Sequence, residues 1–233
     1  MSKTKKSTKC AKSFGESIDS SMDSMEETRF KKKFQDVIYR LSKKFHFTYA
    51  EMEGLLIVYY KLQKQSKDFY SGVDKSQFRD VLHSALDMTD DYLMDRIFYA
   101  LDRGPSAFIS METWAATLSL FLRGTLEEKI NYCYSVYDTM GDGTLGRENL
   151  FHLLKNSLVS QGTDEEAEES AKDMIEVITK KMDIDRDGKI SFNDYKQSVL
   201  RQPMLLEAFG QCLPSRTDIY TFMTTCITNM SKM

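Results

Sequence analysis

The chain has 233 residues, 41% of them hydrophobic and 29% charged, with a formal net charge of −3. This balance is ordinary for one or two globular domains, and it excludes a chain whose overall charge recruits nucleic acid. The sequence has no apolar run of the roughly 18 residues that span a bilayer and no apolar leader. It also has no Gly at position 2 for myristoylation. We therefore expect an intracellular, soluble protein without a membrane partner.

The first 28 residues are rich in lysine and then in serine and acidic residues, with few apolar side chains. This composition predicts a disordered tail over residues 1–28, basic first and acidic after. From Arg29 onward, Phe30, Phe34, Val37 and Ile38 recur at helical spacing among basic residues, which indicates a basic amphipathic segment.

Helical patterns then follow one another closely. Thr48 with Glu51 and Thr125 with Glu128 have the spacing of capping boxes at helix starts. Apolar residues at intervals of three and four predict helices over residues 48–62, 74–85, 89–101, 111–121, 125–137, 150–158, 171–182, 192–199 and 218–227. We interpret the acidic residues 161–170 as a solvated linker.

One loop in this series carries the clearest chemistry. Residues 183–194 read DIDRDGKISFND, which matches the EF-hand pattern of oxygen ligands at alternate positions with a turning glycine at the sixth. The expected calcium ligands are the side chains of Asp183, Asp185, Asp187, Ser191 and Asp194 and the backbone carbonyl of Lys189. The last position is Asp194 where the pattern prefers Glu, and the shorter side chain favours weaker calcium selectivity and more competition from magnesium.

Two earlier loops depart from this pattern. In the loop that opens at Asp138, Asp142 and Thr144 occupy ligand positions, but Met140 offers a soft thioether that suits calcium poorly. Gly146 and Asn149, at the ninth and twelfth positions, add little, so we expect a scaffold loop in which Asp138, Asp142 and Thr144 are the residual candidate ligands. The loop that opens at Asp102 has lost its acidic positions and its turning glycine, and we expect no metal there.

These observations predict an all-α fold of paired EF-hand helix–loop–helix units in two lobes, with short β-bridges between paired loops. We expect an N-terminal pair with degenerate loops over residues 29–122 and a C-terminal pair over residues 125–200. A C-terminal extension over residues 201–233 follows.

Beyond the loops, several segments resemble the calaxins, EF-hand proteins of ciliary and flagellar axonemes. The segments are 88–91 (MTDD), 94–96, 118–124 with 126–129, 151–158, 180–183, and 205–210 with 212–214. The resemblance covers about residues 45 to 214. It implies a calcium sensor on the outer dynein arm, associated with the docking complex on the doublet microtubule. The family pattern has usable ligands in the two earlier loops, which this sequence lacks, so the resemblance points to a divergent paralogue.

Three functions remain open at this level. The first is an axonemal adaptor or regulator that grips helices of outer dynein arm or docking-complex proteins, with tubulin as a further partner of the lysine-rich tail. The second is a soluble calcium sensor or a regulatory subunit of another enzyme. The third is a structural protein that works without metal.

An enzyme is not expected. The sequence has no phosphate-binding GxxxxGK[ST] or GxGxxG motif, and no nucleophile stands beside a histidine-containing catalytic motif. A zinc site is not expected either, because the four cysteines and three histidines do not combine at ligand spacing. We interpret the cysteines as reduced, packed thiols.

Overall fold

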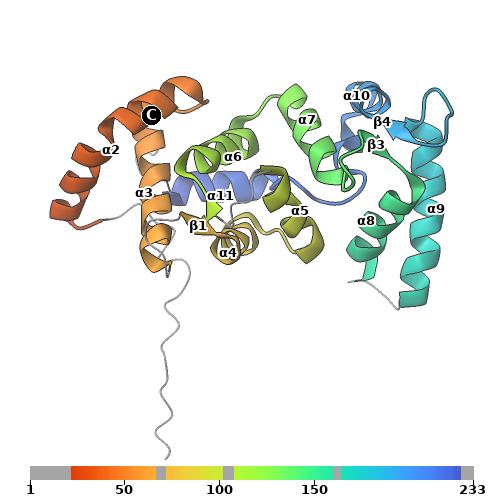
Figure 1. Ribbon diagram of the computed structural model, residues 1–233, viewed down its shortest axis with the longest axis horizontal. Coiled ribbons are helices and arrows are strands. Elements are labelled where there is room, and N and C mark those ends of the chain that lie inside the picture. The colour runs from red at the N-terminus through yellow and green to blue at the C-terminus, as the bar shows by residue number, and fades with distance from the viewer. Residues whose placement is uncertain (1–21, 67–71, 102–107, 160–163, 227–233) are drawn as a thin grey trace, which may run out of the picture.

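The computed structural model in Figure 1 describes residues 22–66, 72–101, 108–159 and 164–226. Most of the predicted tail, and residues 102–107 of the loop that opens at Asp102, lie outside the described residues. The described chain forms four helix–loop–helix units in two lobes. The N-terminal lobe contains α3 (Tyr49–Gln65), α4 (Lys75–Leu86), α5 (Asp91–Leu101) and α6 (Met111–Arg123); the C-terminal lobe contains α7 (Leu126–Tyr137), α8 (Arg147–Val159), α9 (Asp164–Met182) and α10 (Phe192–Arg201).

Short antiparallel strand pairs join the loops within each lobe. In the N-terminal lobe, β1 (Val73–Asp74) pairs with β2 (Phe108–Ile109); in the C-terminal lobe, β3 (Thr144–Leu145) pairs with β4 (Ile190–Ser191). The predicted all-α fold, with paired helix–loop–helix units and short β-bridges, is confirmed.

Local signals in the sequence start several helices where they were expected. Capping boxes form at Thr48 with Glu51, at Asp74 with Gln77 and at Thr125 with Glu128. Each satisfies backbone N–H groups that a first helical turn leaves without partners.

Aromatic side chains dominate the core of each lobe. In the N-terminal lobe, Trp114 is fully buried and donates its indole N–H to the carbonyl of Leu55 over 3.1 Å. In the C-terminal lobe, the ring of Tyr137 meets the ring of Phe209 edge-on at 5.2 Å between centroids. Buried rings of this size supply much of the apolar area that stabilises such small lobes.

Several helix boundaries differ from the predictions, and three helix starts show the physical reason. α2 (Ser24–Lys44) begins inside the predicted tail, because Asp23 caps its first turn. α9 begins at Asp164, so residues 164–170 are helical and not a linker. Acidic residues suit the first turn of a helix, which carries the positive end of the helix dipole. α11 (Arg216–Cys226) begins before Asp218, and the hydroxyl of Ser215 accepts from the Asp218 N–H.

The C-terminal extension joins the two lobes. Its first part, the short helix η1 (Pro203–Glu207), packs against α7 and α10. The chain then runs back along the molecule, and α11 packs against α3 and α4 of the N-terminal lobe, as Figure 1 shows. Phe222 and Met223 of α11 are buried in this contact. None of the described helices combines the length and apolar character needed to cross a membrane.

Candidate metal centre

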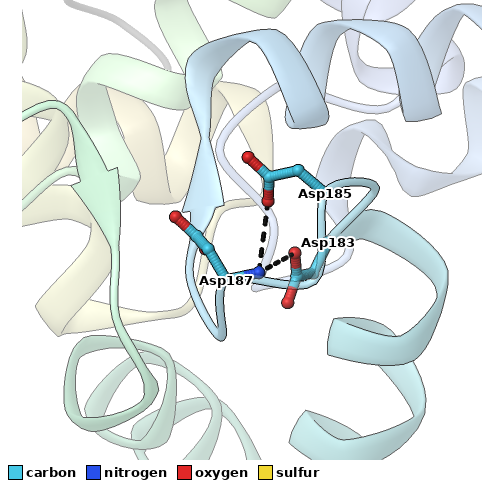
Figure 2. A group of neighbouring side chains, drawn as sticks. All are labelled: Asp183, Asp185 and Asp187. Atoms are coloured by element: carbon cyan, nitrogen blue, oxygen red, sulfur yellow. Dashed lines mark hydrogen bonds between the residues drawn. The ribbon is translucent and has the colours of Figure 1, made fainter.

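Three carboxylates gather at the start of the loop between α9 and α10. Figure 2 shows the side chains of Asp183, Asp185 and Asp187 grouped in this loop. One oxygen of each lies within 4.8 Å of the others. Within the part of the chain that the structure describes, this is the one cluster of three or more acidic, histidine or cysteine side chains with such spacing. The structure therefore brings together three of the predicted ligands.

Backbone N–H groups hold these carboxylates in the loop. The Asp187 N–H donates to Oδ1 of Asp183 over 3.2 Å and to Oδ1 of Asp185 over 3.3 Å. The Gly188 N–H donates to Oδ2 of Asp183 over 2.9 Å, and the Lys189 N–H donates to Oδ1 of Asp187 over 2.7 Å. Gly188 has a φ of +85°, the left-handed conformation that lets the chain turn around the cluster.

The β-bridge fixes the end of the loop against its partner loop. Ile190 pairs with Leu145, and both side chains are fully buried. The hydroxyl of Tyr134 on α7 lies 2.7 Å from the carbonyl of Gly143 and 3.2 Å from that of Ile190. Tyr134 thus contacts both loops of the lobe. Tyr134 falls within the helix predicted over residues 125–137, and no local motif indicated this second role.

Ser191 and Asp194, the two other side chains predicted as ligands, form hydrogen bonds at the start of α10. They form a capping box at the start of α10, in which Oδ2 of Asp194 accepts from the Ser191 N–H at 3.1 Å and from the Ser191 hydroxyl at 2.6 Å. Asp194 is buried and is not part of the three-carboxylate cluster. Because both hydrogen bonds end on Oδ2, Oδ1 is the oxygen of Asp194 that a cation can use.

The carboxylates of the cluster repel one another. The hydrogen bond from the Asp187 N–H lowers the pKa of Asp185, but desolvation and the charges of Asp187 and Asp194 outweigh it, so the pKa lies above its ordinary value. A hard divalent cation takes carboxylate oxygens as ligands and removes this repulsion. The donor set therefore fits calcium or magnesium, with Asp183, Asp185 and Asp187 as its described core.

The loop that opens at Asp138 shares part of this hydrogen-bond pattern, but it has Met140 where the other loop has Asp185. Asp138 accepts from the N–H groups of Gly141 at 2.7 Å and Gly143 at 3.0 Å, and Asp142 accepts from the Thr144 N–H at 2.9 Å and hydroxyl at 3.1 Å. These bonds from Thr144 lower the pKa of Asp142. They close the loop by hydrogen bonds between its own residues.

The two poor ligands of this loop behave as their chemistry suggests. The side chain of Met140 is 80% exposed. Oδ1 of Asn149 accepts from the Thr139 hydroxyl at 2.7 Å. Among the described residues this loop has no cluster of three acidic side chains like that of the Asp183 loop, and hydrogen bonds between its own residues support its conformation.

Known proteins match both the site and most of the chain. A family model described as an EF-hand domain pair matches residues 127–200. Calaxin of Xenopus laevis is 44% identical over 198 residues, which are 84% of this chain and 94% of that protein. Calaxin of Homo sapiens is 43% identical and covers 79% of this chain and 89% of its own length. A recoverin family protein of Dictyostelium discoideum is 24% identical and covers 73% of this chain and 83% of its own length.

Proposed function

Because the chain belongs to the calaxin family of EF-hand proteins, we propose that it binds calcium through the Asp183 loop and acts as an adaptor or regulator on the outer dynein arm docking complex of the ciliary or flagellar axoneme. The chain is not an enzyme, as expected for this family. The observation that carries the proposal is the cluster of Asp183, Asp185 and Asp187 inside the matched EF-hand pair.

The surroundings of the loop support a regulatory role for the cation. α9 leads directly into the loop, and with α8 it lines an apolar groove of about 430 Å³ that includes Phe151 and Ile175. Met174 and Val177, also on α9, are partly exposed. In sensor EF-hands, calcium changes the angle between paired helices and opens such a groove to an amphipathic helix. The partner that fits is a helical segment of a docking-complex or dynein-arm protein.

Calcium binding is tested by calorimetry on the full chain in millimolar magnesium. We expect one site, which Asp185→Asn abolishes because it removes one charge from the three-carboxylate cluster. Asp173→Asn removes an exposed carboxylate from α9, outside the loop, and should leave binding unchanged. Asp142→Asn tests the second loop and should also leave the one site intact. Equal binding by the wild type and the Asp185→Asn variant would contradict the proposed site.

The location is tested by extracting isolated axonemes with salt and following the protein with an antibody. We expect it to co-fractionate with outer dynein arms and their docking proteins. A uniform cytosolic pool would contradict the adaptor function and favour a soluble regulator. Calorimetry and fractionation are independent. If the protein binds calcium but does not co-fractionate with outer dynein arms, the proposed metal site stands and the proposed partner is contradicted.

A further inference from the structure

Helix α2 carries a basic face that the calcium site does not explain. Between residues 29 and 44 the sequence has seven basic residues and one acidic residue, in a chain of net charge −3. Six of the basic side chains and the acidic one are exposed and share one face of the helix: Arg29, Lys32, Lys33, Asp36, Arg40, Lys43 and Lys44. At 1.5 Å per residue, this basic face is about 22 Å long.

Most of this charge is not neutralised by the described part of the protein. No ion pair is present there for Arg29, Lys32, Lys33 or Lys43. Arg40 and Lys44 share the carboxylate of Glu112, but both remain more than half exposed. Like charges along one helix face repel one another, so this arrangement costs stability unless a partner uses it. The basic face therefore points to an anionic ligand.

An aromatic groove adjoins the basic face. It lies between α2, α3 and the start of α6, and its volume is about 430 Å³. Phe34, Val37, Tyr60 and Met111 are among its lining residues, with Lys33 and Arg40 from the basic face. The rings of Phe34 and Tyr60 meet edge-on at 6.0 Å between centroids. The groove can take an apolar side chain directly beside the cationic groups.

We infer that the basic face of α2 and this groove bind an acidic polypeptide segment, one that combines Asp or Glu residues with an aromatic or aliphatic side chain. The charges supply long-range attraction to the acidic residues, and the groove takes the apolar side chain. Among the described helices, α2 lies at the end of the molecule away from the C-terminal lobe, as Figure 1 shows, so none of that lobe's helices covers its basic face.

The structure disfavours two other anionic ligands. An amphipathic helix that lies on a membrane inserts its apolar face between lipids, whereas Phe30, Ile38 and Leu41 of α2 are buried in the protein core. A nucleic acid presents an unbroken row of phosphates, but Asp36 stands in the middle of the basic face and Glu112 lines the groove. A peptide can place uncharged residues at both points.

This inference does not rest on the proposed calcium site, which lies in the other lobe. Peptide binding is therefore expected to be the same in calcium and in chelator. Loss of calcium binding and loss of peptide binding are then separate results, obtained from different variants.

The test uses the full chain and a fluorescein-labelled peptide of glutamates with one central tryptophan, followed by anisotropy in chelator. We expect saturable binding that weakens as salt rises, because the Debye length shortens. The variant R29E/K32E/K43E should weaken binding at least about tenfold. The variant K172E/K181E/R201E makes the same change of charge at exposed positions of the C-terminal lobe and should stay within about twofold. A peptide with glycine in place of tryptophan should bind more weakly to the wild type, because the groove is then empty.

Thermal unfolding establishes that both triple variants are folded, and the milder R29Q/K32Q/K43Q replaces the first if it is not. Several results would overturn the inference. They are no binding of the peptide at low salt, equal losses in the two triple variants, and tighter binding of a single-stranded oligonucleotide or of vesicles containing phosphatidylserine through the same three residues.

Discussion

At the scale of single residues, Asp194 limits how well the Asp183 loop can hold calcium. Its side chain is one methylene shorter than the usual Glu, and one of its two oxygens already accepts both hydrogen bonds of the capping box. A longer side chain at this position reaches the cation with two oxygens while a capping box remains possible.

We expect Asp194→Glu to tighten calcium binding about tenfold and to reduce competition by magnesium, which prefers smaller octahedral sites. Calorimetry with calcium, in the presence and absence of magnesium, measures both effects. Asp173→Glu adds the same methylene on the exposed surface of α9 and should change neither. An unchanged affinity in Asp194→Glu would mean that the capping hydrogen bonds, and not side-chain length, decide the role of this residue.

The sequence was sufficient to predict the carboxylate ligands of this loop, but not the contacts that surround them. Asp183, Asp185 and Asp187 were predicted from spacing alone, because alternate positions in a tight loop must converge. The hydrogen bond from the Tyr134 hydroxyl to the Ile190 carbonyl was not predictable, since the two residues are 56 positions apart in the chain. The separate position of Asp194 also escaped prediction, because the same residue serves the loop motif and the cap of α10.

At the scale of elements, one ion pair joins the start of α3 to the end of α6. Glu51 is buried and accepts hydrogen bonds from both terminal nitrogens of the Arg123 guanidinium group, Nη1 to Oε2 at 2.9 Å and Nη2 to Oε1 at 2.5 Å. Burial alone would raise the pKa of Glu51, but hydrogen bonds from Arg123 and Thr48 overcome it and lower the pKa below its ordinary value. A lowered pKa means that the ionised form stabilises the fold.

We expect Arg123→Met to reduce the free energy of unfolding by about 2–3 kcal/mol at pH 7, because it leaves the buried carboxylate without its partner. The loss should shrink as the pH falls through the lowered pKa of Glu51, where protonation ends the contribution of the pair in the wild type too. Urea unfolding at several pH values measures this. Lys44→Met breaks the exposed pair with Glu112 and should cost less than about 1 kcal/mol. A loss from Arg123→Met that does not depend on pH would contradict this explanation.

Helix starts were predictable where a capping box marked them and less so elsewhere. The predicted capping box of Thr48 and Glu51 is present, but nothing local indicated that Arg123 completes it from 72 positions away. For α2 and α9, acidic and serine-rich composition was interpreted as tail and linker. The same residues are favourable in a first helical turn, so composition alone does not separate the two cases.

At the scale of the whole molecule, the sequence predicted a last helix but not the surface on which this helix packs. An amphipathic helix can dock on any complementary apolar face, and α11 follows directly from residues that pack on the C-terminal lobe. There Tyr137 donates its hydroxyl to the carbonyl of Gly210 over 2.7 Å, and Glu207 accepts from the Cys212 and Leu213 N–H groups. The contact of α11 with α3 and α4 depends on tertiary packing, which the spacing of apolar residues along the sequence does not determine.

We expect Phe222→Ala to lower the free energy of unfolding of the N-terminal lobe by about 3 kcal/mol, because it opens a cavity between α11 and the lobe. Tyr220, on the same helix, is 71% exposed, and Tyr220→Ala should cost less than about 0.5 kcal/mol. Chemical denaturation followed by the fluorescence of Trp114 measures both. Equal effects of the two substitutions would contradict the packing of α11 described above.

The return of α11 means that the backbone passes between the lobes twice, once through Gly124 and once through the segment after α10. The lobes are therefore joined by two backbone connections and not by a single linker. If one lobe rotates about Gly124, the segment between α10 and α11 must also change its conformation, because buried side chains anchor both ends of that segment. A disturbance at the Asp183 loop thus has a short mechanical route, through α10 and the extension, to the opposite end of the protein.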